Sequence, residues 1–386
     1  MNISAITNQM EEGLTTSVFP GAVLLVSHQN KIVFHKGFGQ RRIKTKEKQT
    51  SVDLQTIFDL ASLTKPLVTT AAIAQLLQQN RLCLHDPLQK FLPDFFGKEK
   101  SQVTIFHLLN HSSGLPAWQP YYQKVQAQEK KTPGFLGTLS AKQAIFKMAH
   151  AETLKAHPGE ISRYSDIGFI LLGEVVEKIC GMPLNTYFSK YIVSAFKQSE
   201  SFFPQRPENP QNINNTDSRH FAATEDSKWR KGVISGIVHD DNAYAMGGIA
   251  GHAGLFATAH GVYQLVQTWL DSIKDKGFLS PEIAEKFVSR QKDVMSPAGA
   301  SWALGWDSPS VLSGRGSPKV SSSGHHFAPS SFGHLGFTGT SIWVDRTHEL
   351  VVIFLSNRVH PSRENERIRS FRPKLHNLIF ETLIHA

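Results

Sequence analysis

The feature that most restricts the fold of this chain is the position of its strand-like segments, which lie at the two ends. Residues 21–37 (GAVLLVSHQNKIVFHKG) contain two runs of β-branched and other apolar residues around the polar residues HQN, and this pattern predicts a β-hairpin. Residues 341–344 and 350–355 form two further strand-like runs, joined by a turn around Arg346 and Thr347. Helical patterns fill the region between. The sequence therefore predicts an α+β fold (an α/β sandwich), with one antiparallel sheet built from both chain termini, flanked by helices, and an inserted helical lobe.

This arrangement predicts a single domain over residues 1–386, with a sheet lobe at about 15–60 and 240–386 and a helical lobe at about 61–239. The chain has 386 residues, of which 40% are hydrophobic and 19% charged, so it can bury the large core that such a domain needs.

Local patterns add detail to this outline. Residues 168–179 (GFILLGEVVEKI) predict a buried helix, and a last helix is expected from Arg363, kinked or restarted at Pro373. Residues 203–217 predict a polar, proline-bearing loop. Residues 308–331 contain nine serines, a composition too poor in apolar groups to pack, so we expect a mobile loop there.

The net charge of +9 comes from 41 basic and 32 acidic residues that are scattered along the chain. Scattered charges favour a solvated surface over a nucleic-acid groove. The two cysteines, Cys83 and Cys180, form no CxxC pair, so neither a disulfide framework nor a thiolate zinc site is indicated. The first residues (MNISAITNQMEEGLTTS) do not look like an export signal, and no apolar run approaches the roughly 20 residues that span a bilayer. We therefore expect a cytoplasmic protein without a membrane span.

A serine and a lysine stand three residues apart in FDLASLTKPLVTT, residues 58–70. Apolar residues recur at helical spacing from Leu63 onward, and Pro66 falls in the first turn, where proline is tolerated. Ser62 and Lys65 would then share one helical face, as a serine nucleophile and its base require. On its own the motif fits a helix N-cap serine beside a solvated lysine equally well.

The same spacing occurs at Ser194 and Lys197, in YIVSAFKQSE. This second pair precedes a loop instead of heading a long helix, so it reads as an exposed serine and lysine. The spacing alone is therefore a weak signal.

Two distant residues change that balance, namely Tyr164 in RYSDIGF and His334 in GHLGFTGTS. Taken singly, they are more typical of a half-buried tyrosine and of a surface or strand histidine. In order with Ser62 and Lys65, they resemble the three motifs of the serine beta-lactamase and penicillin-binding-protein superfamily. The resemblance is to its class C-like branch, which also holds carboxylesterases, D-aminoacyl peptidases and muropeptide amidase-like members, and whose motifs run SxxK, YxN, then KTG or HxG. Supporting phrases are TIFHLLNHSSGLP, HPGEISRYSDIGFILLGEVVE and FGHLGFTGTSIWVD, so the resemblance covers nearly the whole chain.

The resemblance implies a beta-lactamase/transpeptidase-like fold and gives each motif residue a role. Ser62 attacks a carbonyl to form an acyl-enzyme. Lys65 accepts its proton, with a pKa lowered by desolvation and by nearby Arg or His charges. Tyr164 carries a proton to the leaving group and later activates water.

The resemblance also implies an oxyanion hole made of the backbone amides of Ser62 and Phe337, with Gly336 allowing the strand edge to approach the substrate closely. Two positions depart from the family pattern. Asp166, expected among the substrate-binding residues, places a carboxylate where the YxN motif has an amide that could donate to a substrate carbonyl, which counts against recognition of beta-lactams and D-alanyl amides. His334, ionised only partly near neutral pH, stands where the third motif often has lysine. With no permanent cation for a substrate carboxylate, the expectation tilts towards esters or less anionic amides.

Residues 238–259 (VHDDNAYAMGGIAGHAGLFATA) raise a rival interpretation, because they contain or adjoin residue types that bind metal. Their spacing matches no strong metal motif, and the glycines suggest a packed turn that forms the wall and floor of the pocket. We therefore expect no metal and no cofactor. The residues concerned are His239, Asp240, Asp241, His252 and His260.

Two function classes follow. The first is a serine hydrolase acting through an acyl-enzyme on carboxylic esters, D-aminoacyl peptides, muropeptide amides or beta-lactams. The second is a non-catalytic acyl-binding or scaffold relative, and a metal-dependent hydrolase is the less favoured third. The expected partner is a small-molecule or peptide substrate, with no nucleic acid, and the sequence leaves the oligomeric state open.

Overall fold

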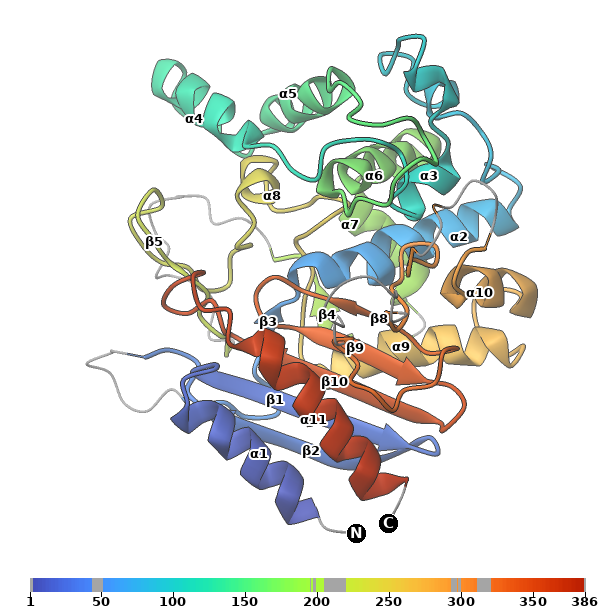
Figure 1. Ribbon diagram of the computed structural model, residues 1–386. Coiled ribbons are helices and arrows are strands. Elements are labelled where there is room, and N and C mark those ends of the chain that lie inside the picture. The colour runs from blue at the N-terminus through green and yellow to red at the C-terminus, as the bar shows by residue number, and fades with distance from the viewer. Residues whose placement is uncertain are drawn as a thin grey trace.

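A five-stranded antiparallel sheet lies at the centre of the computed structural model (Figure 1). Its order is β2-β1-β10-β9-β8, so the two strands from the start of the chain lie beside the three strands from its end, with no strand from the middle. The predicted fold class is confirmed. The structure describes residues 3–43, 51–194, 196, 199–204, 220–292, 297, 300–310 and 321–384. The strands of this sheet are β1 (Gly21–His28), β2 (Lys31–Gly39), β8 (Phe332–Leu335), β9 (Ser341–Asp345) and β10 (Leu350–Ser356).

The predicted hairpin is β1 and β2, joined by Gln29 and Asn30, which both have positive φ (50° and 60°). Positive φ at both central residues is the conformation of a two-residue turn that matches the twist of paired strands. At the other end of the chain, β9 and β10 match the two predicted runs to within one residue at each end.

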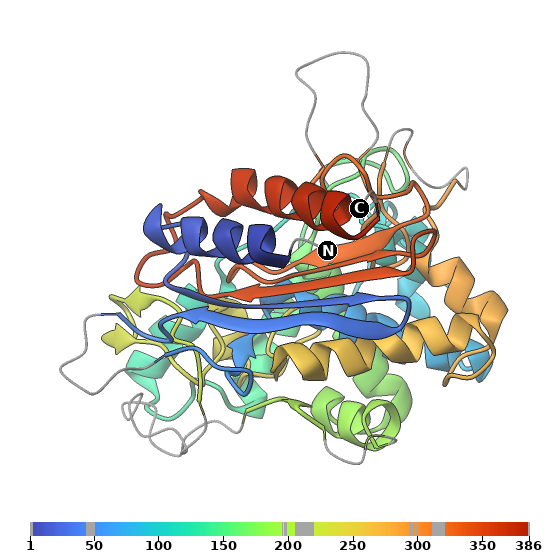
Figure 2. The same ribbon diagram turned by 90° about the horizontal axis from the view of Figure 1, so that it is seen from below.

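Both faces of the sheet are buried, which explains the unbroken apolar runs of its central strands. Helices α1 (Ile3–Thr15) and α11 (Ile368–Leu383) cover one face side by side, and α9 (Ala259–Ile273) packs on the other (Figure 2). In β1, alternate residues face the two sides, since Leu24 belongs to the core under α11 and Leu25 to the larger core.

The prediction for the last helix was partly wrong. Helix α11 begins at Ile368 and not at Arg363, and it continues across Pro373. Proline removes one backbone donor from a helix interior, but the buried residues Phe371 and Leu375 pack against the sheet and hold the helix on both sides of it. The predicted helix at residues 168–179 is α6, Asp166–Cys180.

The remaining helices and short strands lie mostly on the far side of the sheet from α1 and α11 (Figures 1 and 2). The division into a sheet lobe and a helical lobe stays an interpretation. The α-helices are α2 (Ala71–Gln78), α3 (Ile105–Leu109), α4 (Tyr121–Lys131), α5 (Leu139–His150), α7 (Leu184–Tyr187), α8 (Asp241–Ala245) and α10 (Pro281–Val288), and the short strands are β3 (Phe58–Asp59), β4 (Ser201–Phe202), β5 (Asp226–Ser227), β6 (Gly232–Val233) and β7 (Phe256–Ala257).

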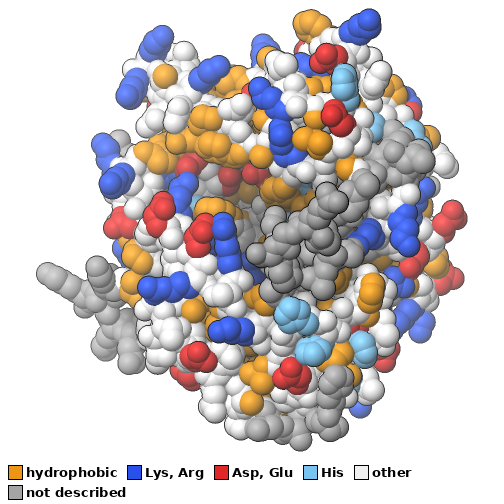
Figure 3. All heavy atoms as spheres, in the orientation of Figure 1, with side chains coloured by type: hydrophobic (Ala, Val, Ile, Leu, Met, Phe, Trp, Pro, Cys, Tyr) orange, Lys and Arg blue, Asp and Glu red, His pale blue; other side chains and the backbone are white. Residues whose placement is uncertain are grey.

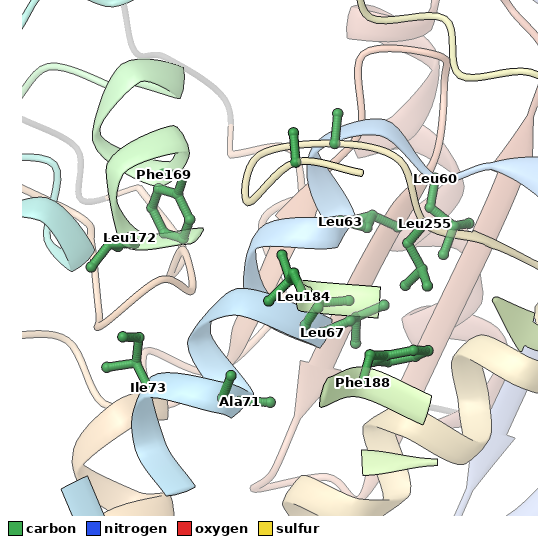
Figure 4. Packing of buried hydrophobic residues seen from close by; sticks show 14 of the residues in the cluster. Leu60, Leu63, Leu67, Ala71, Ile73, Phe169, Leu172, Leu184, Phe188 and Leu255 are labelled. Atoms are coloured by element: carbon green, nitrogen blue, oxygen red, sulfur yellow. The ribbon is translucent and has the colours of Figure 1, made fainter. Parts of the chain in front are cut away.

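Ser62 lies at the start of a long helical segment, as expected. A 3₁₀ turn (Ala61–Leu63) leads into a π-helical turn (Lys65–Thr70) and then into α2. Figure 4 shows Leu67 of this segment close to Leu184 and Phe188, and Leu63 close to Leu255, in the core. This apolar packing fixes the segment, so the polar side chains in its first turns are held in defined positions.

Basic and acidic side chains are interspersed on the face shown in Figure 3. No helix in the described ranges is long and apolar enough to cross a membrane. The predicted loop at 203–217 lies largely outside the described residues, at 205–219, as does the middle of the serine-rich stretch, at 311–320. The expectation that residues 308–331 are too poor in apolar groups to pack was wrong for 321–331, where Ser323, Phe327 and Ser331 are buried and Phe327 joins the core under α11.

Candidate active site

The motif residues from three distant parts of the chain meet at one cavity of about 710 Å³. Lys65 lies beneath its floor and is fully buried. The predicted site residues that line the cavity are Ser62, Tyr164, Asp166, His334, Gly336 and Phe337.

Lys65 connects the serine to the tyrosine motif. Its Nζ donates to Ser62 Oγ at 2.9 Å, to Asp166 Oδ1 at 2.6 Å and to the carbonyl oxygen of His252 at 3.2 Å. Asp166 is the first residue of α6, where a negative charge is favourable, and its side chain is 19% exposed to the cavity. A buried ammonium with three acceptors is thus held next to the serine hydroxyl.

The predicted lowering of the Lys65 pKa was wrong. Burial alone would lower the pKa of this amine, but the carboxylate of Asp166 and the hydroxyl of Tyr164 outweigh burial, so the pKa of Lys65 is raised. The sequence interpretation treated Asp166 only as a substrate contact. In the folded protein it is first of all the counter-ion of Lys65.

Tyr164 is held from both sides by His111. The His111 carbonyl accepts from the Arg163 amide at 2.8 Å, and His111 Nδ1 accepts from the Ser165 amide at 3.1 Å. The hydroxyl of Tyr164 interacts with both Lys65 and Ser62. Burial raises the pKa of Tyr164, although the charge of Lys65 acts in the opposite direction. The tyrosine is therefore neutral at rest and in reach of both groups.

His334 is an uncharged residue here, which corrects the expectation of a partly ionised imidazole. Its side chain is buried, and Nδ1 donates to its neighbour's carbonyl, Leu335 O, at 2.8 Å. Burial, together with the charge of Lys65, lowers the pKa of His334 to about 3. Its Nε2 has no hydrogen-bond partner among the described residues.

The end of β8 packs tightly against the segment before Ser62. A Cβ atom on Gly336 would lie 2.0 Å from Thr340 Oγ1 and 2.5 Å from the Leu60 carbonyl oxygen, so only glycine fits. Within the chain this close approach is to Leu60, and the approach of the strand edge to a substrate stays a prediction. The backbone amides of Ser62 and Phe337 donate no hydrogen bond to any other group within the described part of the chain.

Residues 6–372 match the family described as Beta-lactamase. This chain belongs to the beta-lactamase family. A relative from Escherichia coli (strain K12), named "Putative D-alanyl-D-alanine carboxypeptidase", is 30% identical over 380 residues, which cover 92% of this chain and 82% of that protein.

Two solved structures share the fold of this beta-lactamase family member. An octameric penicillin-binding protein homologue from Pyrococcus abyssi has a TM-score of 0.69 at 21% identity, covering 98% of this chain and 78% of that one. EstCE1, a hydrolase with promiscuous acyltransferase activity, has a TM-score of 0.68 at 20% identity, covering 96% and 98%. The family match supports a hydrolase of the serine type in general terms, and the two solved structures support the fold alone.

The residues considered for a metal are each engaged with another side chain in this beta-lactamase family fold. His252 contacts Asp240 at 2.8 Å, and Asp241 pairs with Arg230 at 2.6 Å. His239 contacts Glu225 at 3.1 Å, and His260 contacts Glu200 at 3.3 Å. Across the described ranges, no three His, Cys, Asp or Glu side chains are grouped so that they could hold a metal ion.

Arginines that the sequence interpretation missed line the same cavity. Arg363 pairs with Glu225 and Asp241, and Arg369 pairs with Glu366 at 2.6 Å. Arg358 and Arg372 also line it, but neither pairs with a carboxylate within the described residues. The premise that the site has no permanent cation was therefore wrong. No local signal marks these arginines in a basic chain, because only the fold brings them to the cavity.

The second serine–lysine pair has a different setting. Ser194 is exposed and does not line the cavity, whereas Lys197 lies outside the described residues.

Proposed function

We propose that this member of the beta-lactamase family is a serine hydrolase that cleaves ester or amide bonds through an acyl-enzyme on Ser62. One observation carries the proposal: Ser62 Oγ lies in the cavity at 2.9 Å from the buried Nζ of Lys65, with the hydroxyl of Tyr164 in reach of both. A serine becomes nucleophilic when a group beside it can take its proton. A non-catalytic acyl-binding scaffold would not need all three groups.

The raised pKa of Lys65 changes how the proton moves in this proposal. The reactive form has lost one proton from the pair of Lys65 and Tyr164, so one of the two accepts the Ser62 proton as Oγ bonds to the carbonyl carbon. Tyr164 then protonates the leaving group as its bond to carbon breaks. In the second half, water loses a proton to the same pair and attacks the acyl carbon, and Ser62 regains its hydrogen. The free amides of Ser62 and Phe337 stabilise the negative oxygen in both halves.

The test is active-site labelling with matched serine variants. The wild type should react with a fluorophosphonate probe at Ser62, as located by peptide mass spectrometry, and should hydrolyse para-nitrophenyl butyrate. Ser62→Ala should lose both labelling and turnover, and Ser194→Ala should lose neither. Equal loss in both variants, or full turnover by Ser62→Ala, would contradict the assignment. Turnover that EDTA abolishes would favour the metal-dependent class instead.

A second candidate substrate class is a peptide that ends in a D-amino acid with a free carboxylate. Arg372 favours it, because this arginine has no carboxylate partner among the described residues and a substrate carboxylate would supply one. The name of the Escherichia coli relative points the same way. Release of D-alanine from an acyl-D-alanyl-D-alanine peptide, measured beside ester hydrolysis, decides between the two classes. The cytoplasmic location remains a prediction, which fractionation of the source cells tests.

A further inference from the structure

Asp59 carries a buried carboxylate and is hydrogen-bonded to Ala61 and Thr338, the chain neighbours of Ser62 and Phe337. It stands three residues before Ser62 and is 2% exposed. Its Oδ1 accepts from the Ala61 amide at 2.8 Å and its Oδ2 from the His239 amide at 2.6 Å. Asp59 has no ion-pair partner in the part of the chain that the structure describes. A carboxylate buried in this way is costly, so its backbone contacts need a reason.

On one side, Asp59 holds the backbone that leads into Ser62. Ala61 has a φ of +48°, in the left-handed region that residues with a side chain rarely adopt. The bond from the Ala61 amide to Asp59 Oδ1 closes a tight turn around this residue. Because Ala61 directly precedes Ser62, its conformation sets the direction of the Ser62 amide.

On the other side, Asp59 holds the segment that carries Phe337. The hydroxyl of Thr338 donates to the main-chain oxygen of Asp59 at 2.7 Å, and that of Thr340 donates to Leu60 O at 3.1 Å. Both threonines are fully buried or nearly so. Thr338 directly follows Phe337, so this bond sets the position of the second amide relative to the first.

His239 completes the arrangement. Its amide is bonded to Asp59 Oδ2, and its ring stacks on the ring of Phe337 with centroids 5.7 Å apart and planes at 20°. Three chain segments that line the cavity are therefore tied to one residue, with Asp59 at the centre.

We propose that Asp59 is a positioning residue that fixes the separation of the Ser62 and Phe337 amides and so builds the oxyanion hole. This inference rests on the proposed hydrolase function. Such donors act only when they lie about 2.7–3.1 Å from the developing oxyanion, and small displacements greatly reduce the rate. Asp59 does not touch the substrate. Its contribution is expected in the transition state and not in substrate binding.

The experiment compares Asp59→Asn with a matched control. Asparagine keeps the size and one acceptor, but it turns the other acceptor into a donor that faces a backbone N–H. We expect kcat for para-nitrophenyl butyrate to fall roughly 10- to 100-fold with KM within about threefold, since only the transition state is affected. The affinity for an alkyl boronic acid, which forms a tetrahedral adduct on serine, should fall by the same factor.

The control is Asp345→Asn, because Asp345 is also fully buried and accepts from the amides of Ala328, Thr347 and His348 but does not line the cavity. It should lower the melting temperature without changing kcat.

A second pair of variants keeps the test decisive if Asp59→Asn folds poorly. Thr338→Val removes the hydroxyl that reaches Asp59 and should show the same parallel loss of kcat and boronate affinity, while Thr338→Ser should restore both. The inference is overturned if Asp59→Asn and Thr338→Val keep wild-type kcat and boronate affinity, if Asp345→Asn loses as much, or if serine does not rescue. Full turnover by Ser62→Ala in the same assay would instead reject the proposed function, and this inference with it.

Discussion

Two buried cations at the cavity are held in opposite ways, and we call their surroundings the paired, Ser62 end (Lys65) and the unpaired, arginine end (Arg372). At the Ser62 end, Lys65 is fully buried and forms an ion pair with Asp166 at 2.6 Å. At the other end, Arg372 is 6% exposed, and its guanidinium donates to the Thr340 carbonyl at 2.9 Å, with no carboxylate partner among the described residues. A paired buried charge is part of the internal machinery of a protein. An unpaired buried charge is available to a ligand, because an anion that binds there neutralises a charge that otherwise has no partner.

The arginine end keeps its charge at neutral pH despite this isolation. Burial, together with the neighbouring Arg358, lowers the pKa of Arg372 to about 9. Arg372 therefore remains protonated under physiological conditions. Arg358 binds the carbonyl oxygen of Phe337 through Nε at 2.9 Å and Nη2 at 2.6 Å, so the arginine end adjoins the proposed oxyanion hole.

The largest effect on kcat is expected from substitution of Lys65 at the paired end. Lys65→Met fills similar space but removes the cation and the proton carrier, so kcat for para-nitrophenyl butyrate should fall by about 10³-fold or more. The matched control is Lys142→Met, which breaks another ion pair, with Glu177 at 2.5 Å, away from the cavity. The control should lose stability but keep kcat. Comparable loss of kcat in the two variants would mean that Lys65 acts only through folding.

Substitution of Arg372 at the unpaired end should change the substrate preference and leave the chemical step unchanged. The test uses two thioesters with the same acyl group, one with a thioglycolate leaving group and one with that carboxylate methylated. We expect the wild type to favour the charged thioester in kcat/KM, and Arg372→Met to reduce that preference about 10- to 100-fold, as loss of a charge-assisted hydrogen bond implies.

The control for this comparison is Arg346→Met, which removes one surface arginine paired with Glu285 at 2.7 Å and leaves the cavity unchanged. It should keep the wild-type preference. A wild type that turns over the methylated thioester faster would restore the original expectation from the sequence, that uncharged substrates are preferred.

The same contrast explains how much the sequence could predict. The central strands and the helix that starts near Ser62 are encoded by local periodicity, so they could be located before the fold was known. The ordered motifs of a known superfamily then brought Ser62, Tyr164 and His334 to one site. Both cues depend on short segments and on resemblance.

The charge states could not be predicted in this way, because they depend on pairs that only the fold creates. Lys65 and Asp166 are 101 residues apart in the chain, and their contact reverses the expected direction of the Lys65 pKa. Burial is equally non-local: nothing in GHLGFTGTS marks His334 as an uncharged residue. Arg372 lies in α11, and the start of this helix was predicted at Arg363, five residues before the observed start at Ile368.

The smallest effect is expected from Asp166→Asn, which leaves Lys65 without its carboxylate partner and so makes the paired end resemble the unpaired one. Asp166→Asn keeps the size of the side chain and an oxygen acceptor but removes the carboxylate that raises the pKa of Lys65. The form of the site with one proton fewer should then appear at lower pH. We expect the acid limb of the kcat/KM profile for para-nitrophenyl butyrate to move to lower pH, with a modest gain at neutral pH. Glu174→Gln, which breaks the buried contact with His150 at 2.7 Å, is the control and should leave the limb in place.

We expect Asp166→Asn to lower the stability of the protein at neutral pH although it raises the activity there. A lysine whose pKa is raised by folding stabilises the protein fully below its unfolded value of about 10.4, and this contribution is lost only as the pH rises through the folded pKa. Asp166→Asn removes the counter-ion, so its free energy of unfolding at pH 7 should be lower than that of the wild type, as urea denaturation will measure. An acid limb that stays in place or moves to higher pH would show that Asp166 does not control the proton on Lys65. A shift to lower pH with a loss of stability would mean that the wild type keeps Lys65 charged for the fold, at some cost in reactivity.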